Sequence, residues 1–113
     1  MTVATFDVCD NRFEITVDGH ADFNPGGPDI VCSACSTLCC TLAQSVLEME
    51  SMGEVFTEAG FEIENQPGHF KMLFTAHAWA ASKAHTLVDH TMAGFFLLES
   101  QYPRNVRLKT GEK

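Results

Sequence analysis

The chain has 113 residues, 45% of them hydrophobic, which suits one domain over residues 1–113 built around a single core. Fifteen acidic side chains against seven basic ones give a formal net charge of -8, and no basic cluster is present to neutralise phosphates, so direct nucleic-acid binding is not expected. An acidic surface favours a basic protein partner, although charge of this kind also serves solubility alone.

The cysteine content and the N-terminal sequence indicate the compartment. Five cysteines, an odd number, are typical of reduced thiols and not of a disulfide framework. The N-terminal residues lack the basic start and the unbroken apolar stretch of a signal peptide, and no run approaches the roughly 20 apolar residues of a membrane span. We therefore expect a cytoplasmic protein without membrane association. We also expect no metal or other cofactor.

Two strands open the chain. Residues 2–8 and 12–18 alternate between inward apolar and outward polar side chains, and Asp10-Asn11 between them is typical of a hairpin turn. The second strand leads directly into Gly19-His20. We therefore expect His20 at a rigid strand end, where a catalytic base gains a fixed geometry.

A helix is predicted from about Asp29 to Met52, with Asp29 as its N-cap and Gly53 as its stop. Its buried stripe is predicted to consist of Val31, Cys35, Leu38, Leu42, Val46 and Met49. The flank of that stripe is predicted to carry Cys32, Ser36, Cys39 and Ala43. Cys32 thus falls in the first turn, where free amides and the helix dipole favour the thiolate over the thiol.

The rest of the chain continues the alternation of strands and helices. The predicted elements are strands over 60–65 and 69–75, a helix over about 80–101, and a short strand over 106–109. Phe70, Met72 and Phe74 are predicted to point inward. The order ββαββαβ predicts an α+β fold with two helices packed on a mostly antiparallel sheet.

One loop separates the two residues that indicate a catalytic function. His20 and Cys32 have eleven residues between them, broken by glycine and proline, which is enough chain for the imidazole to meet the thiol as base and nucleophile. The alternative is that Cys32 is a buried small hydrophobe, as free cysteines more often are. The substrate loop that would close over the site includes Gly19, Ala21, Gly26 and Gly27.

Residues near this pair are candidates for supporting roles. Asp22 or Asp29 is a candidate to orient the imidazole, with helix capping as the alternative for Asp29, and Ser36 is a further supporting candidate. Backbone amides at the helix start, including that of Cys32, are predicted to stabilise the oxyanion because no intrahelical acceptor uses them.

A family resemblance rests on the same segment. Gly19-His20-Ala21, a glycine-containing loop, and residues 29–32 (DIVC) followed by small residues and Ser36 resemble the signature of the ribosomal-processing cysteine protease family, Prp. Residues 68–70 (GHF) and 102–108 (YPRNVRL) resemble two further family segments, so the likeness extends over essentially the whole chain. Two departures from the pattern are Ser33, where alanine is usual, and Cys35, which adds a second thiol.

The resemblance implies a bacterial cysteine endopeptidase. Members of this family remove a short N-terminal extension from the large-subunit ribosomal protein near the peptidyl-transferase centre, a step in ribosome maturation. It implies Cys32 as nucleophile, His20 as general base, a basic ribosomal protein as partner, and a homodimer. The apolar run from Phe95 to Leu98 fits a dimer contact and, equally, a deeply buried helix.

Two alternatives use the cysteines differently. Cys32-x-x-Cys35 at a helix start has the spacing of a thiol-disulfide oxidoreductase, although no βαβ unit precedes it. A non-catalytic metal or protein-binding module would use Cys32, Cys35, Cys39 and Cys40, but a second ligand pair is missing. The histidines other than His20 lack a regular ligand spacing and are interpreted as scattered surface residues.

Overall fold

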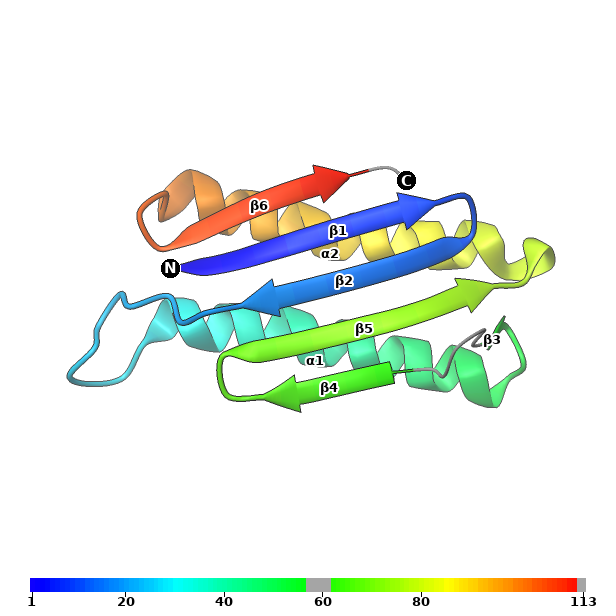
Figure 1. The fold of residues 1–113 in the computed structure, drawn as a ribbon, viewed down its shortest axis with the longest axis horizontal. Coiled ribbons are helices and arrows are strands. Elements are labelled where there is room, and N and C mark those ends of the chain that lie inside the picture. The colour runs from blue at the N-terminus through cyan, green and yellow to red at the C-terminus, as the bar shows by residue number, and fades with distance from the viewer. Residues whose placement is uncertain (57–61, 112–113) are drawn as a thin grey trace.

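The computed structural model describes residues 1–56 and 62–111, which form a six-stranded sheet with two helices covering one face (Figure 1). The elements in chain order are β1 (Thr2–Cys9), β2 (Arg12–Asp18), α1 (Ile30–Ser51), β3 (Val55–Phe56), β4 (Glu62–Gln66), β5 (His69–Ala76), the 3-10 turn η1 (Ala78–Ala80), α2 (Ala81–Gln101) and β6 (Val106–Gly111). The predicted α+β fold is confirmed, and β3 is an additional strand.

The sheet has the strand order β3-β5-β2-β1-β6, and β4 pairs with the same side of β5 as β3 does. Every pair is antiparallel except β1 with β6, which is parallel. The turn between β1 and β2 places Asp10 in the left-handed region at a φ of 52°, which aspartate tolerates better than most residues. The predicted hairpin at Asp10-Asn11 is therefore confirmed.

The core lies between the sheet and the helices. Alternate residues of the central strands are buried on this face, and they include Ala4, Phe6, Phe13, Ile15, Val17, Phe70, Met72 and Phe74. Phe6 contacts Phe95 of α2 edge to face, with ring centroids 5.9 Å apart. This period-two burial is what the sequence pattern predicts for a sheet covered on one side.

Helix α1 has the predicted boundaries, with Asp29 as N-cap and Gly53 in the left-handed region at a φ of 73° just after its end. Its buried face is wider than predicted. Cys39 and Ala43, which were expected on the flank, are buried, whereas Leu38 is only partly buried. The reason is that the buried sector extends toward the β4–β5 hairpin, since Cys39 lines a crevice with residues of that hairpin.

Helix α2 begins after η1 and buries Ala84, Val88, Thr91 and Phe95. Phe96 and Leu97 remain 57% and 58% exposed, so the apolar run at 95–98 is not a deeply buried helix in this chain. Gly60 and Phe61, which were predicted to begin the strand now described as β4, lie outside the described residues.

Helix α1 differs from the expectation that no segment of the chain is long and apolar enough to span a membrane. Helix α1 is long and apolar enough to cross a membrane by length and composition alone. Core helices pass the same test, and the buried residues of α1 belong to the core cluster that it shares with the sheet.

Candidate active site

The loop between β2 and α1 lies at one end of the sheet and joins the two segments that carry the candidate catalytic residues (Figure 1). His20 follows the end of β2 by two residues, and Cys32 lies in the first turn of α1. Cys32 as a residue is partly buried and packs against the core. The strand end and the helix start thus bring together the two segments that the sequence predicted to meet.

Asp29 joins the loop to the helix start. Its Oδ1 accepts hydrogen bonds from the amides of Val31 and Cys32 at 3.0 and 2.9 Å, as an N-cap does. Its Oδ2 accepts from the amides of Phe23 and Asn24 at 2.9 and 3.4 Å. Hydrogen bonding, first of all from the Cys32 amide, lowers the pKa of Asp29 below its usual value. Both oxygens are therefore committed to backbone amides, and Asp29 is a cap rather than a partner of the imidazole.

The same contacts correct the expected source of oxyanion donors. The Cys32 amide was predicted to be free because no intrahelical acceptor uses it, but it donates to Asp29 Oδ1. The Ser33 amide donates to the Asp29 carbonyl oxygen at 3.0 Å. In this arrangement the amides of residues 31–33 already have acceptors and are not available to a tetrahedral intermediate.

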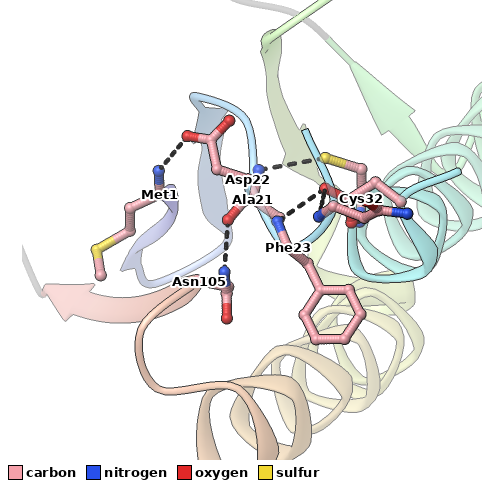
Figure 2. A network of polar contacts seen from close by, with 8 residues as sticks. Met1, Ala21, Asp22, Phe23, Cys32 and Asn105 are labelled. Carbon is pink, nitrogen blue, oxygen red and sulfur yellow. Dashed lines mark hydrogen bonds and ion pairs between the residues drawn. The ribbon is translucent and has the colours of Figure 1, made fainter. Parts of the chain in front are cut away.

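The loop contacts the thiol through one backbone amide. The Ala21 N–H donates to Cys32 Sγ, with the nitrogen 3.2 Å from the sulfur (Figure 2). Ala21 is 1% exposed, which makes it the buried anchor of an otherwise exposed loop. Because His20 Cα is two bonds from the Ala21 nitrogen, it lies within about 6 Å of Cys32 Sγ.

The imidazole of His20 faces the turn between β4 and β5. A Cβ atom built on Gly68 would lie 2.8 Å from His20 Nε2, so the ring rests directly against this glycine. The Gly19 amide donates to the Gly68 carbonyl oxygen at 2.8 Å, which ties the two segments together. In the part of the chain that is described, no hydrogen bond joins His20 to Cys32. In this arrangement the His20 ring therefore contacts Gly68 and does not form a hydrogen bond with the thiol.

The other predicted loop residues have separate roles. Asp22 has a φ of 56°, and its carboxylate pairs with the amino group of Met1 at 3.3 Å, so it does not orient the imidazole. Gly26 has open space around its Cα, and the Gly27 amide donates to the Asn24 carbonyl oxygen at 3.2 Å in an exposed turn. Ser36 is exposed one turn beyond Cys32, beside a crevice of about 60 Å³ between α1 and the β4–β5 hairpin.

Two residues that the sequence left without a role also contact the loop. The Asn105 side chain donates to the Ala21 carbonyl oxygen at 2.8 Å (Figure 2). Phe23 packs edge to face on Tyr102, with ring centroids 5.3 Å apart. Asn105 and Tyr102 both belong to residues 102–108, the segment that resembles the family pattern. That resemblance was the sequence signal that could have pointed to them.

The cysteine side chains bear on the alternative of a thiol-disulfide oxidoreductase. All five are free, and Cys35 is 5% exposed. Burial, with smaller contributions from Cys32 and Asp29, raises the pKa of Cys35 to about 11. A thiol with this pKa is protonated at neutral pH, so Cys35 is not itself a nucleophile there. Over residues 1–56 and 62–111, no group of three or more histidine, cysteine, aspartate or glutamate side chains is arranged to hold a metal ion.

One of the other histidines is not simply scattered on the surface. His69 Nδ1 lies 2.5 Å from Asp18 Oδ1, and its Nε2 lies 3.0 Å from Glu64 Oε2. The hydrogen bond with Asp18, followed by that with Glu64, raises the pKa of His69 above its usual value. His69 thus links β2, β4 and β5 next to Gly68.

The chain is similar to a known family of proteins. The family model described as cysteine protease Prp matches residues 1–107. Among curated proteins, the comparison finds no match.

Solved structures share the fold. The essential ribosomal processing protease Prp from Staphylococcus aureus, in complex with a covalently linked product peptide, is 22% identical with a TM-score of 0.72, covering 97% of this chain and 99% of that chain. The same protease with a substrate peptide is 21% identical with a TM-score of 0.69 and the same coverage. SMU.848 from Streptococcus mutans is 23% identical with a TM-score of 0.71, covering 100% of this chain and 96% of that chain.

Proposed function

This chain belongs to the cysteine protease Prp family, and from that premise we propose that Cys32 is its nucleophile and His20 its general base. The observation that carries this proposal is the hydrogen bond from the Ala21 amide to Cys32 Sγ. It holds the backbone of His20 within about 6 Å of the sulfur, a distance that an imidazole can bridge by rotating away from Gly68.

The proposed reaction is acyl transfer. His20 takes the thiol proton of Cys32, and the resulting sulfur anion, which accepts a hydrogen bond from the Ala21 amide, attacks the scissile carbonyl carbon. His20 gives a proton to the departing amine, so that the amine leaves neutral and an acyl-thioester remains on Cys32. His20 then removes a proton from water, which hydrolyses the thioester and restores the free thiol.

The substrate that we propose is the N-terminal extension of a basic large-subunit ribosomal protein. Two similar structures are described as a ribosomal processing protease with a product or a substrate peptide. The net charge of -8 favours encounter with a basic protein. Phe23 in the loop and Ile30 at the start of α1, which are 44% and 60% exposed, offer apolar contacts to a peptide near Cys32.

Loop movement provides a means of specificity. Residues 22–28 are held by exposed hydrogen bonds to Asp29 and by an exposed turn, and the open surroundings of Gly26 leave this part of the loop room to move. We propose that the correct peptide draws the loop over the site and His20 toward Cys32, so that the active arrangement forms only with substrate bound.

Four further features belong to the same proposal. The whole chain, residues 1–113, acts as one protease domain in the cytoplasm and needs no metal or other cofactor. It works as a homodimer, and Phe96 and Leu97 supply exposed apolar surface on α2 for a contact between copies.

The test uses a peptide that spans the N-terminus of the host's large-subunit ribosomal protein that lies near the peptidyl-transferase centre. We expect the wild type to cleave it at one bond and Cys32→Ala to leave it intact, as followed by mass spectrometry. Cys40→Ala is the matched control, because Cys40 is an exposed cysteine elsewhere on the same helix. Cleavage by Cys32→Ala, or its loss in Cys40→Ala, would contradict the assignment.

A further inference from the structure

Asn105 lies at the corner between α2 and β6, where its backbone is held on both sides. Its amide donates to the Tyr102 carbonyl oxygen at 2.9 Å, and its carbonyl oxygen accepts from the Thr2 amide at 2.8 Å. The next residue, Val106, is fully buried and begins β6. The start of the Asn105 side chain is therefore fixed by the sheet and by the end of α2.

The Asn105 side chain reaches the residue next to the candidate base. Its Nδ2 donates to the Ala21 carbonyl oxygen at 2.8 Å, and the Ala21 amide donates to Cys32 Sγ at 3.2 Å (Figure 2). Both polar backbone groups of this buried alanine are thus engaged, one by the nucleophile and one by Asn105. A buried carbonyl group without a partner is costly, so removal of the Asn105 amide favours a different position for Ala21.

We propose that Asn105 is a positioning residue of the protease: it aims the Ala21 amide at the sulfur of Cys32 and fixes the backbone of His20. The inference rests on the proposed function, because it takes Cys32 as nucleophile and His20 as base. An amide N–H aimed at sulfur stabilises the thiolate more than the thiol, since a hydrogen bond to a charged acceptor is the stronger one. Asn105 touches neither sulfur nor substrate and acts through Ala21.

A second contact at the same corner supports this role. Phe23 packs edge to face on Tyr102, whose carbonyl oxygen accepts the amides of Asn105 and Val106. Residues 21 and 23 of the loop therefore both contact the segment between α2 and β6, at sequence separations of 84 and 79 residues. The corner fixes the start of the loop, whereas residues 24–28 lie beyond these contacts.

The test compares Asn105→Asp, which keeps the side-chain shape but removes the amide donor, with Asn11→Asp. Asn11 lies in the β1–β2 turn at the other end of the sheet, so the control carries the same charge change away from the site (Figure 1). Both are made in a Cys9→Ser, Cys40→Ser background, in which Cys32 is the accessible thiol because Cys35 and Cys39 are buried. Asn105→Ala, which leaves both backbone hydrogen bonds, replaces the aspartate variant if thermal unfolding shows that the latter is not folded.

The readouts are the pH profile of Cys32 alkylation by iodoacetamide and the kcat and KM of peptide cleavage. For Asn105→Asp we expect alkylation at pH 7 to slow about threefold to tenfold, with its profile moved to higher pH, as the weakening of one hydrogen bond to a charged sulfur implies. We expect kcat to fall about tenfold with KM changed less than about twofold, and Asn11→Asp to behave as the background. A folded Asn105 variant with an unchanged alkylation profile would overturn the proposal.

The two readouts separate this inference from the proposed function. Alkylation needs no substrate, so it decides the role of Asn105 even if the peptide is not cleaved. Cleavage that persists in Cys32→Ala contradicts the proposed nucleophile, and a shifted alkylation profile would still support the contact through Ala21.

Discussion

A side chain at Gly68 would occupy the space that the His20 imidazole takes, because its Cβ would lie 2.8 Å from Nε2. Gly68 also has a φ of 75°, and its carbonyl oxygen accepts the Gly19 amide. The turn between β4 and β5 thus serves two purposes: it ties down the end of β2 and leaves room for the candidate base. The position of His20 depends on a residue far from it in the sequence.

Replacement of Gly68 by alanine should therefore reduce activity more than stability. The new Cβ displaces the imidazole, and a residue other than glycine in the left-handed region costs about 1 kcal/mol. Gly53→Ala is the matched control, since Gly53 has a φ of 73° but nothing within 4 Å of an added Cβ. We expect similar losses of unfolding free energy in the two variants and a lower kcat/KM only in Gly68→Ala. Equal activities in the two variants would contradict a role for Gly68 in placing His20.

Asp29 combines two tasks that one substitution can separate. Serine is a good N-cap, so Asp29→Ser should keep a cap for the amides of Val31 and Cys32. It supplies a single oxygen and should lose the bonds to Phe23 and Asn24. We expect faster limited proteolysis between residues 22 and 28 and a lower kcat/KM, while the helix content measured by circular dichroism stays close to that of the wild type. Unchanged proteolysis of the loop would show that Asp29 does not hold it.

Much of the fold was predictable because the strands show a regular alternation of buried and exposed residues and the first helix has a clear capping residue. The period-two pattern of Phe13, Ile15 and Val17 and the capping signal at Asp29 predict a strand and a helix start correctly. Strand β3 has two residues, too few for a period to be read. Burial of Cys39 depends on how α1 sits beside the hairpin, which periodicity along one helix does not specify.

The site was predictable only in part. Cys32 and His20 were identified by their spacing and by a family resemblance, and their catalytic roles stay predictions. The contact between Asn105 and Ala21 joins residues 84 positions apart and has no local sequence pattern, so it required the tertiary structure. Use of the Cys32 amide by Asp29, in contrast, follows from the predicted N-cap, because Cys32 is the third residue of the helix, and the prediction of a free Cys32 amide did not take that cap into account.

Cys35 provides a test against dithiol chemistry. Its pKa is raised to about 11, chiefly by burial, so it stays protonated at neutral pH and a protease should not need it. We expect Cys35→Ala to retain peptide cleavage within about twofold and to lose about 1 kcal/mol of unfolding free energy for the buried sulfur that is removed. Loss of cleavage in a folded Cys35→Ala protein, together with disulfide-exchange activity in the wild type, would favour the oxidoreductase instead.

His69 should make stability depend on pH with a definite sign. Its pKa is raised in the folded protein by Asp18 and then Glu64, so its stabilising effect is full below the ordinary value of 6.5 and is lost as pH rises through the higher folded value. We expect the Tm difference between wild type and His69→Gln to be larger at pH 5.5 than at pH 9. A difference that grows toward pH 9 would contradict the assigned ion pairs.

The central claim is that the Cys32 sulfur forms a covalent bond to the substrate. Its most direct measurement is the intact mass of the enzyme quenched in acid during the first turnovers of the ribosomal-protein peptide, followed by fragmentation to locate the adduct. We expect a transient mass increase equal to the acyl fragment on Cys32, which is absent in Cys32→Ala and is lost more slowly in His20→Ala than in the wild type. An acyl group on another residue, or turnover by Cys32→Ala, would contradict it.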